Sequence, residues 1–180
     1  KDYYSINYTQ KSNAQPQKPA YSVFIVIATE DNTMVQVTPA VDLLDNHPAG
    51  QPFTLTLKKG QLYQGLSSDD LTGTKITSVN STTGGCTKIA VFSGSSRIDV
   101  GCNPKFITSD NLFQQVYPTA SWGKRYITVP LASRNYDVFR IILSNPATSI
   151  DPNVRINGTW VPLSSFTNGY YEFKSQISNF

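Results

Sequence analysis

The feature that most constrains the fold is a nearly unbroken apolar run close to the start of the chain. The run covers residues 21–28 and ends at the polar stretch 30–33, after which Met34, Val35 and Val37 resume the apolar pattern. Asp and Asn tolerate the left-handed backbone of a tight turn, so the stretch predicts a β hairpin. Because both arms have apolar residues at adjacent positions, we expect both arms to lie centrally in a sheet.

The rest of the chain repeats this pattern of short strands and turns. Phe53, Leu55 and Leu57 alternate with polar residues, and Leu62 follows the Lys59-Gly60 turn, which predicts a second hairpin. Further strands are expected at 1–9, 75–79, 88–94, 137–143, 154–156 and 159–161, and one short helical turn at 41–44. The sequence therefore predicts an all-β fold, antiparallel and sandwich-like, with very little helix.

Two parts of the chain look like copies of one β unit, because their signals recur in the same order. Val23-Phe24 corresponds to Val138-Phe139, each pair is followed by a hairpin, and Gly60 or Gly169 precedes an aromatic strand. The second hairpin contains Asn157-Gly158, a strong signal for a type I′ turn. The predicted division is an N-terminal strand and Pro-containing loop (1–20), a first unit (21–108), a connecting segment (109–131) and a truncated second unit (132–180). These units would form two packed layers or two small sandwiches.

The composition excludes several kinds of partner. Charged residues make up 15% of the chain and the net charge is +3, with no run of Lys or Arg, so we expect no nucleic-acid binding. No apolar run approaches the roughly 20 residues of a membrane span, so we expect no direct membrane insertion. The start at Lys1 and the stop just after the strand-like YYEF suggest a piece of a longer polypeptide.

The two cysteines suggest a disulfide. Cys86 and Cys102 enclose a segment that begins as a strand at 88–94 and could return as another at 97–101, which would bring the sulfurs together. A disulfide closing such a loop would stabilise the fold by about 3 kcal/mol and would indicate an oxidising compartment. The alternative is two buried thiols. Zinc would need two further ligands, and the lone His47 cannot complete such a site.

The residues give little support for catalysis or metal binding. His47 has neither an adjacent cysteine nor a G-x-S-x-G elbow, so a serine or cysteine triad has no base. Asp31, Asp69 and Asp70 are weak calcium candidates, because loop carboxylates can rigidify turns, but no D-x-D-x-D-G loop contains them. The sequence thus predicts a protein that is not an enzyme, without a cofactor.

Aromatic side chains are the remaining candidates for ligand binding. Tyr and Trp offer a large rigid contact area with one polar group, which suits both protein recognition and stacking on sugar rings. The candidates are Trp122, Trp160, Tyr170 and Tyr171. For Trp122, beside Gly123, we favour a packed corner of the core, whereas Trp160 follows the Asn-Gly turn and fits either role.

Four motifs resemble a known family. They are VFIVIATEDNTMVQVTP (23–39), FTLTLKKGQLYQGLSSDDLTGTKI (53–76), KIAVFSG (88–94) and DNLFQQVYPTASWGKRYITVPL (110–131). Together they resemble the domain named after the IgG Fc-binding protein, which occurs in animal mucus proteins and in secreted or surface proteins of gliding and gut bacteria. The residues of these motifs are more similar to those of the bacterial branch of the family than to those of the animal branch.

The resemblance implies an extracellular or cell-surface module that binds or adheres rather than reacts. Its ligand would be a protein or a glycan, and the family name makes IgG Fc one possibility. The alternatives are a structural spacer within a long adhesin and a carbohydrate-binding or carbohydrate-active module. A binding module predicts an exposed aromatic patch at Trp160, Tyr170 or Tyr171, and a spacer predicts none.

Overall fold

The chain folds into two compact units. Unit 1 is Lys1–Trp122 and unit 2 is Gly123–Phe180. The computed structural model describes residues 1–8, 19–79, 85, 87–98, 110–128, 136–144, 154–166 and 170–176.

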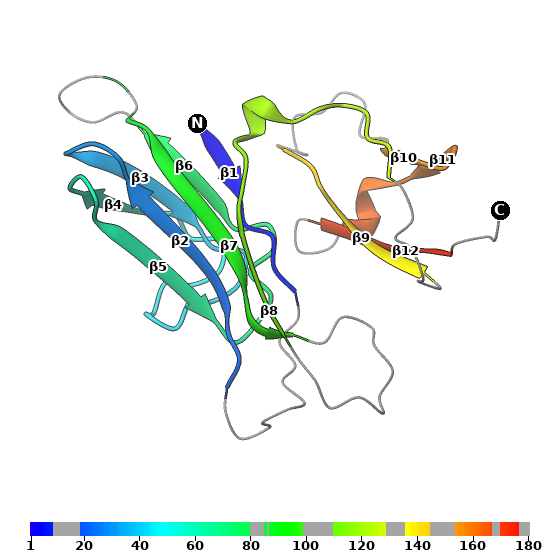
Figure 1. Cartoon of the computed structure of the whole chain (residues 1–180), viewed down its shortest axis with the longest axis horizontal. Coiled ribbons are helices and arrows are strands. Elements are labelled where there is room, and N and C mark those ends of the chain that lie inside the picture. The colour runs from blue at the N-terminus through cyan, green and yellow to red at the C-terminus, as the bar shows by residue number, and fades with distance from the viewer. Residues whose placement is uncertain are drawn as a thin grey trace. The chain divides into compact units, whose positions relative to one another are not determined.

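Unit 1 consists of two four-stranded antiparallel sheets (Figure 1). Sheet A contains, in spatial order, β1 (Asp2–Tyr4), β6 (Lys75–Val79), β3 (Thr33–Thr38) and β4 (Phe53–Leu57). Sheet B contains β5 (Leu62–Ser67), β2 (Ser22–Ala28), β7 (Ile89–Ile98) and β8 (Asp110–Gln115). The described residues contain no α-helix and only the short 3-10 turns η1 (Thr119–Ser121) and η3 (Leu163–Ser165). The predicted all-β antiparallel fold is confirmed.

The core of unit 1 lies between its two sheets. Alternate residues of the central strands point into it, and Phe24 and Val26 of β2 are fully buried, as are Val35 and Val37 of β3. They belong to one hydrophobic cluster with Val91 of β7. Period-two alternation gives each strand one side for this shared core, so the sheets form the two layers of a sandwich.

The two hairpins predicted in the first half of the chain are wrong. Strand β2 pairs with β5 and β7, and β3 pairs with β4 and β6, so the turn at 29–32 and the turn at 58–61 each carry the chain from one sheet to the other. Asn32, with φ 54°, reverses the chain as expected. A reversal does not fix the pairing partner, and both arms bury their apolar sides in one core from opposite layers. The predicted central positions of β2 and β3 are confirmed.

The loop between β3 and β4 covers the edge of β5 that β2 leaves open. The Leu44 amide donates to the Leu66 carbonyl at 2.9 Å, and the Leu43 side chain is buried in the core. The helical turn predicted at 41–44 is wrong, because the Leu43 amide bonds forward to the His47 carbonyl (2.9 Å) rather than back along a helix. This loop protects one edge of sheet B from further strand pairing.

Strand β7 is the longest strand in the described part of the chain. It runs unbroken from Ile89 to Ile98, so the hairpin predicted to return at residues 97–101 is wrong, because Arg97 and Ile98 continue the same strand. The strand that returns along it is β8, whose register with β7 shifts between Ser95 and Ile98. The connecting stretch singled out in the sequence therefore begins as the fourth strand of sheet B.

The N-terminal segment after β1 enters the sandwich through side-chain hydrogen bonds. Asn7 is fully buried, and its Nδ2 donates to the carbonyls of Val23 (3.0 Å) and Gly94. The Asn7 amide donates to Thr72 Oγ1 at 2.8 Å, and the hydroxyl of Ser93 lies between the amide and the carbonyl of Ile6 (3.1 and 3.0 Å). Hydroxyl groups thus satisfy buried backbone that no ladder pairs.

The described residues of unit 2 form two two-stranded antiparallel sheets. Strand β9 (Tyr136–Ile142) pairs with β12 (Tyr170–Gln176), and β10 (Val154–Ile156) pairs with β11 (Thr159–Val161). Asn157 and Gly158, between β10 and β11, have φ values of 48° and 85°. A type I′ turn needs positive φ at both central positions, so the predicted hairpin is confirmed.

The pairing order of unit 2 repeats part of unit 1. In unit 1 the outer pair is β2 with β5 and the inner pair is β3 with β4. In unit 2 the outer pair is β9 with β12 and the inner pair is β10 with β11. This order agrees with an internal duplication, which stays a prediction together with its boundaries.

Candidate binding surface

The outward side of sheet B carries apolar side chains on every strand. Because Phe24 and Val26 point into the core, Ile25 and Ile27 between them point outward. Residues opposite each other in antiparallel strands share one side of the sheet, so the pairing registers extend this set across β5, β7 and β8. We call it the apolar face, and its side chains are Ile25, Ile27, Leu62, Leu66, Ala90, Phe92 and Phe113.

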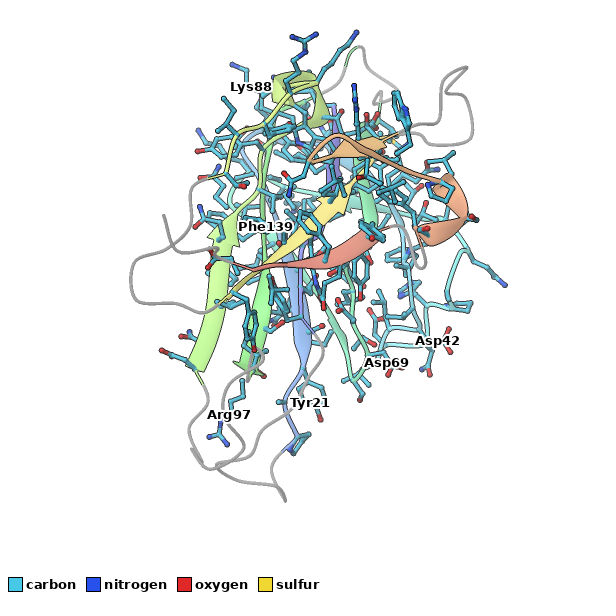
Figure 2. All side chains as sticks on the ribbon, turned by 90° about the vertical axis from the view of Figure 1, so that its right-hand side faces the viewer. Tyr21, Asp42, Asp69, Lys88, Arg97 and Phe139 are labelled. Carbon is cyan, nitrogen blue, oxygen red and sulfur yellow. The ribbon has the colours of Figure 1, made fainter. Side chains whose placement is uncertain are left out.

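The apolar face is accessible and carries no charge. Leu62 is 57% exposed and Phe113 is 52% exposed, and the others are half-buried beside them. No lysine or arginine occurs in the segments 22–28, 62–67, 89–96 and 110–115. Their single acidic residue, Asp110, lies at the start of β8. Lys88 and Arg97 lie towards the two ends of β7 (Figure 2). The surface between the charged ends is therefore hydrophobic.

Sheet A presents the opposite character on its outward side. Its strands place mostly polar side chains there, in register with one another: Gln36, Thr38, Thr54, Thr56, Lys75 and Thr77, with Met34 and Val79 as apolar neighbours. A half-solvated antiparallel sheet is expected to alternate apolar and polar residues in this way. Sheet B departs from this alternation, because its strands carry apolar residues on the outward side as well as on the core side. Strands of this kind usually have other protein packed against both sides. The two outward sides of the sandwich therefore differ in polarity.

Phe113 extends the apolar face onto the edge strand. Its ring stacks on Phe92, with centroids 5.5 Å apart and ring planes 5° from parallel. Gly94 lies opposite Phe113, and a Cβ at Gly94 would overlap the backbone carbonyl of Leu112. Only glycine lets β8 lie this close to β7, so Gly94 determines where Phe113 is presented.

Trp122, the last residue of unit 1, lies beside β1. It is half-buried, its indole nitrogen donates to the Tyr117 carbonyl at 3.1 Å, and its ring is 5.7 Å from that of Tyr4. These contacts tie the segment after β8 to β1.

The other three predicted ligand-binding aromatics lie in unit 2, in two different sheets. Trp160 of β11 is 58% exposed, and the Arg155 guanidinium lies over its ring at 5.5 Å. Tyr170 and Tyr171 belong to β12 and are half-buried, with the Arg140 guanidinium 4.5 Å from the centre of the Tyr170 ring. The structure therefore presents one strongly exposed aromatic ring among the three.

His47 lies in a small hydrogen-bonded cluster beside β5. Its Nδ1 is 2.9 Å from Asp45 Oδ1, its ring stacks on Phe53, and the Tyr63 hydroxyl donates to Asp45 Oδ2 at 2.7 Å. Burial acts to raise the pKa of Asp45, but the bonds from Tyr63 and His47 outweigh it and hold that pKa below its ordinary value. Burial, and then the bond to Asp45, raise the pKa of Tyr63. The cluster fastens the β3–β4 loop.

Two of the three calcium candidates, Asp31 and Asp70, accept hydrogen bonds from turn residues. Asp31 accepts the Lys59 amide at 3.0 Å, and Asp70 accepts both the amide (3.0 Å) and the hydroxyl (2.6 Å) of Thr72. Asp31 follows β2 whereas Asp69 and Asp70 follow β5, and these strands are antiparallel, so the two groups lie at opposite ends of sheet B. Within the described residues no three His, Cys, Asp or Glu side chains are grouped to hold a metal ion.

Both cysteines of the predicted disulfide, Cys86 and Cys102, lie outside the described residues. The hairpin from which their pairing was inferred is wrong, because β7 is continuous. The predicted disulfide therefore loses the support of a hairpin and stays a prediction.

The apolar face is not among the sites predicted from the sequence, although residues 21–28 carry its signal. A run with apolar residues at every position has two apolar sides, and only one of them can face the core. The other side of β2, with Phe92 and Phe113 beside it, becomes visible as a surface only when the pairing registers are known.

The fold is a two-layer β sandwich in which the outer face of sheet B is apolar. The family model described as IgGFc binding protein matches residues 1–179, and the chain therefore belongs to the IgGFc-binding protein family, which is a family of binding proteins. The predicted family is confirmed, and its bacterial branch stays a prediction.

A human protein named IgGFc-binding protein is similar to most of the chain. The two are 30% identical over 133 residues, which cover 72% of this chain and 2% of the human protein. The chain thus spans a small fraction of the length of this relative. No solved structure matches the chain. Among the described residues there is no helix with the length and apolar character that a membrane crossing requires.

Proposed function

We propose that the chain is an extracellular, non-catalytic binding module whose ligand is a protein, held on the apolar face of sheet B. The observation that supports this most is the contrast between the two outer sides of the sandwich, one threonine-rich and one charge-free and apolar. Contiguous apolar patches on soluble proteins commonly mark interaction sites. Membership of a family of binding proteins agrees with this role.

The chemistry of the apolar face suits a protein ligand. An apolar side chain contributes about 1.5 to 3 kcal/mol when it becomes fully buried at the centre of an interface. The side chains of Ile25 and Phe92 at the centre carry neither a charge nor a hydrogen-bonding group for sugar hydroxyls. The amides of Gln64 and Gln115, both exposed, provide a polar rim.

IgG Fc is the first ligand to test, because the matching family and the similar human protein are both named for binding it. In this proposal the module adheres to its partner as part of a longer secreted or cell-surface protein. A purely structural spacer would have no reason to keep one outer side apolar.

A glycan at Trp160 is a second candidate function. Trp160 is 58% exposed, and Arg155 lies over its ring, so an exposed aromatic ring and a hydrogen-bond donor stand next to each other on the β10–β11 hairpin. Such a pair can stack on a sugar ring and bond its hydroxyls. Trp160→Ala would abolish glycan binding and leave protein binding at the apolar face unchanged.

The test compares two matched lysine substitutions by surface plasmon resonance on immobilised IgG Fc. Ile25→Lys places a charge at the centre of the apolar face, and Gln36→Lys places the same charge on the outward side of β3, the corresponding central strand of sheet A. We expect saturable binding by the native chain, weakened at least tenfold by Ile25→Lys and less than twofold by Gln36→Lys. Circular dichroism verifies that both variants fold. Equal weakening, or none, would reject the apolar face as the site.

A further inference from the structure

Sheet B has one open edge. All residues of β8 are exposed, and no other strand among the described residues pairs with the edge of β8 that faces away from β7. The edge at β5 is covered by the β3–β4 loop through the bond between Leu44 and Leu66. Proteins usually protect open edges with proline, lysine or an inward charge, but β8 (DNLFQQ) has only Asp110, at its start.

The hydrogen-bonding groups on the open edge can be assigned from one contact. The Val116 amide donates to the Val91 carbonyl at 2.9 Å, so Val116 points its backbone groups towards β7. Backbone groups alternate from side to side along an antiparallel strand. Leu112 and Gln114 therefore bond towards β7, and the backbone groups of Asn111, Phe113 and Gln115 face the open edge. The Asn111 amide donates to Asp110 Oδ1 at 2.8 Å, so the edge offers the amides of Phe113 and Gln115 and the carbonyls of all three residues.

We propose that β8 pairs antiparallel with β8 of a second copy of this chain, around a twofold axis at Phe113. In this register Phe113 bonds to Phe113 of the second copy in both directions, and the Gln115 amide donates to the Asn111 carbonyl of the second copy. The pairing uses the outward amides of Phe113 and Gln115 and the outward carbonyls of Asn111 and Phe113, and it joins the two B sheets into one. The pairing does not require the proposed ligand, although Phe113 belongs to both surfaces.

The strand is complementary to itself in charge and in shape. Segment 111–116 carries no charge, so the pairing brings no like charges together, and the two Asp110 side chains lie at opposite ends of the paired segment. Phe113 already stacks on Phe92 (5.5 Å), and the twofold axis extends this stack across the interface to the second copy's equivalent rings. An axis perpendicular to the sheet keeps the same side outward, so both apolar faces lie on one side of the joined sheet.

Sedimentation velocity of the native chain over a range of concentrations tests the association. A single pair of short strands buries little area, so we expect a reversible dimer with a dissociation constant in the micromolar to millimolar range. Phe113→Lys would set two lysines opposite each other and raise the dissociation constant at least tenfold. Thr56→Lys, the same charge change at an exposed position of β4 in sheet A, is the matched control and would leave the dissociation constant unchanged. A native chain that stays monomeric up to millimolar concentration would overturn the proposal.

Cysteine cross-linking tests the register. Hydrogen-bonded antiparallel pairs have Cα atoms about 5.5 Å apart, within disulfide range, so Phe113→Cys would form a covalent dimer on mild oxidation. Gln115→Cys lies on the same side of β8, but the two copies of residue 115 would be about 14 Å apart along the strands and would not cross-link. The same oxidation of the native chain measures the background of cross-linking through Cys86 and Cys102. Equal cross-linking by both variants would reject this register, even if Phe113→Lys failed to fold.

Discussion

Gly65 on β5 lies directly against the ring of Phe24, the largest fully buried side chain of the sandwich. A Cβ added at Gly65 would be less than 3.0 Å from Cε1 and Cζ of that ring and 3.1 Å from Cδ1. The ring cannot move away freely, because it is 0% exposed and packs against Tyr63 at a centroid distance of 5.9 Å. Gly65→Ala therefore overpacks the core between the sheets.

The expected loss of unfolding free energy is about 1 to 3 kcal/mol, the usual cost of extra methyl groups in a filled core. For a chain of this size it corresponds to a fall in Tm of roughly 2 to 4 °C per kcal/mol. Urea unfolding followed by circular dichroism gives the free energies of the native chain, Gly65→Ala, Phe24→Leu and the double variant. A smaller side chain at Phe24 makes room for the methyl group, so the double-mutant cycle should show a favourable coupling of about 0.5 to 3 kcal/mol.

Gly60→Ala is the matched control. Gly60 has φ 79° and open space around its missing Cβ, so alanine there costs about 1 kcal/mol in backbone strain alone. That cost should be the same with or without Phe24→Leu. A neutral Gly65→Ala, or a penalty that Phe24→Leu does not relieve, would refute the packing described between β2 and β5.

The remaining predictions concern the two polar clusters of unit 1. Asp45 has a lowered pKa in the folded protein, so its stabilisation is present above the ordinary value of about 3.9 and is lost as the pH falls through the folded value. The stability gap between the native chain and Asp45→Asn, measured by thermal unfolding, should therefore be present at pH 7 and narrow as the pH falls below about 4; a constant gap would contradict the cluster with Tyr63. Asn7→Ala removes the buried donor to the carbonyls of Val23 and Gly94 and should lower the unfolding free energy by about 1 to 3 kcal/mol, whereas exposed Asn111→Ala should change it by less than about 0.5 kcal/mol. Equal effects of the two Asn substitutions in urea unfolding would contradict the buried role of Asn7.

Local patterns predict the strands well and their partners poorly. The alternation in Phe53, Leu55 and Leu57 gives β4, and Asn157-Gly158 gives the β10–β11 turn, because these signals act within a few residues. The partner of β2 depends on how a core forms between layers, which is a property of the whole of unit 1. A turn that reverses the chain serves a hairpin and a crossing between sheets equally well.

The candidate site shows the same limit. Trp160, Tyr170 and Tyr171 were predicted as ligand-binding residues because they are aromatic, and the structure places them in two sheets of unit 2. The apolar face consists mostly of ordinary aliphatic residues, and none of them is distinctive alone. Only the registers that set Ile25 beside Phe92 show that they share one outer side.

The central claim is that the apolar face binds a protein, and hydroxyl-radical footprinting of the native chain with and without IgG Fc tests it most directly. The method reports the solvent exposure of individual side chains, and Met34, on the outward side of sheet A, serves as the internal reference. The account predicts that saturating Fc lowers the oxidation of Leu62, Phe92 and Phe113 and leaves that of Met34 unchanged. Protection at Trp160 alone, or no protection anywhere on the apolar face with Fc at saturation, would contradict it.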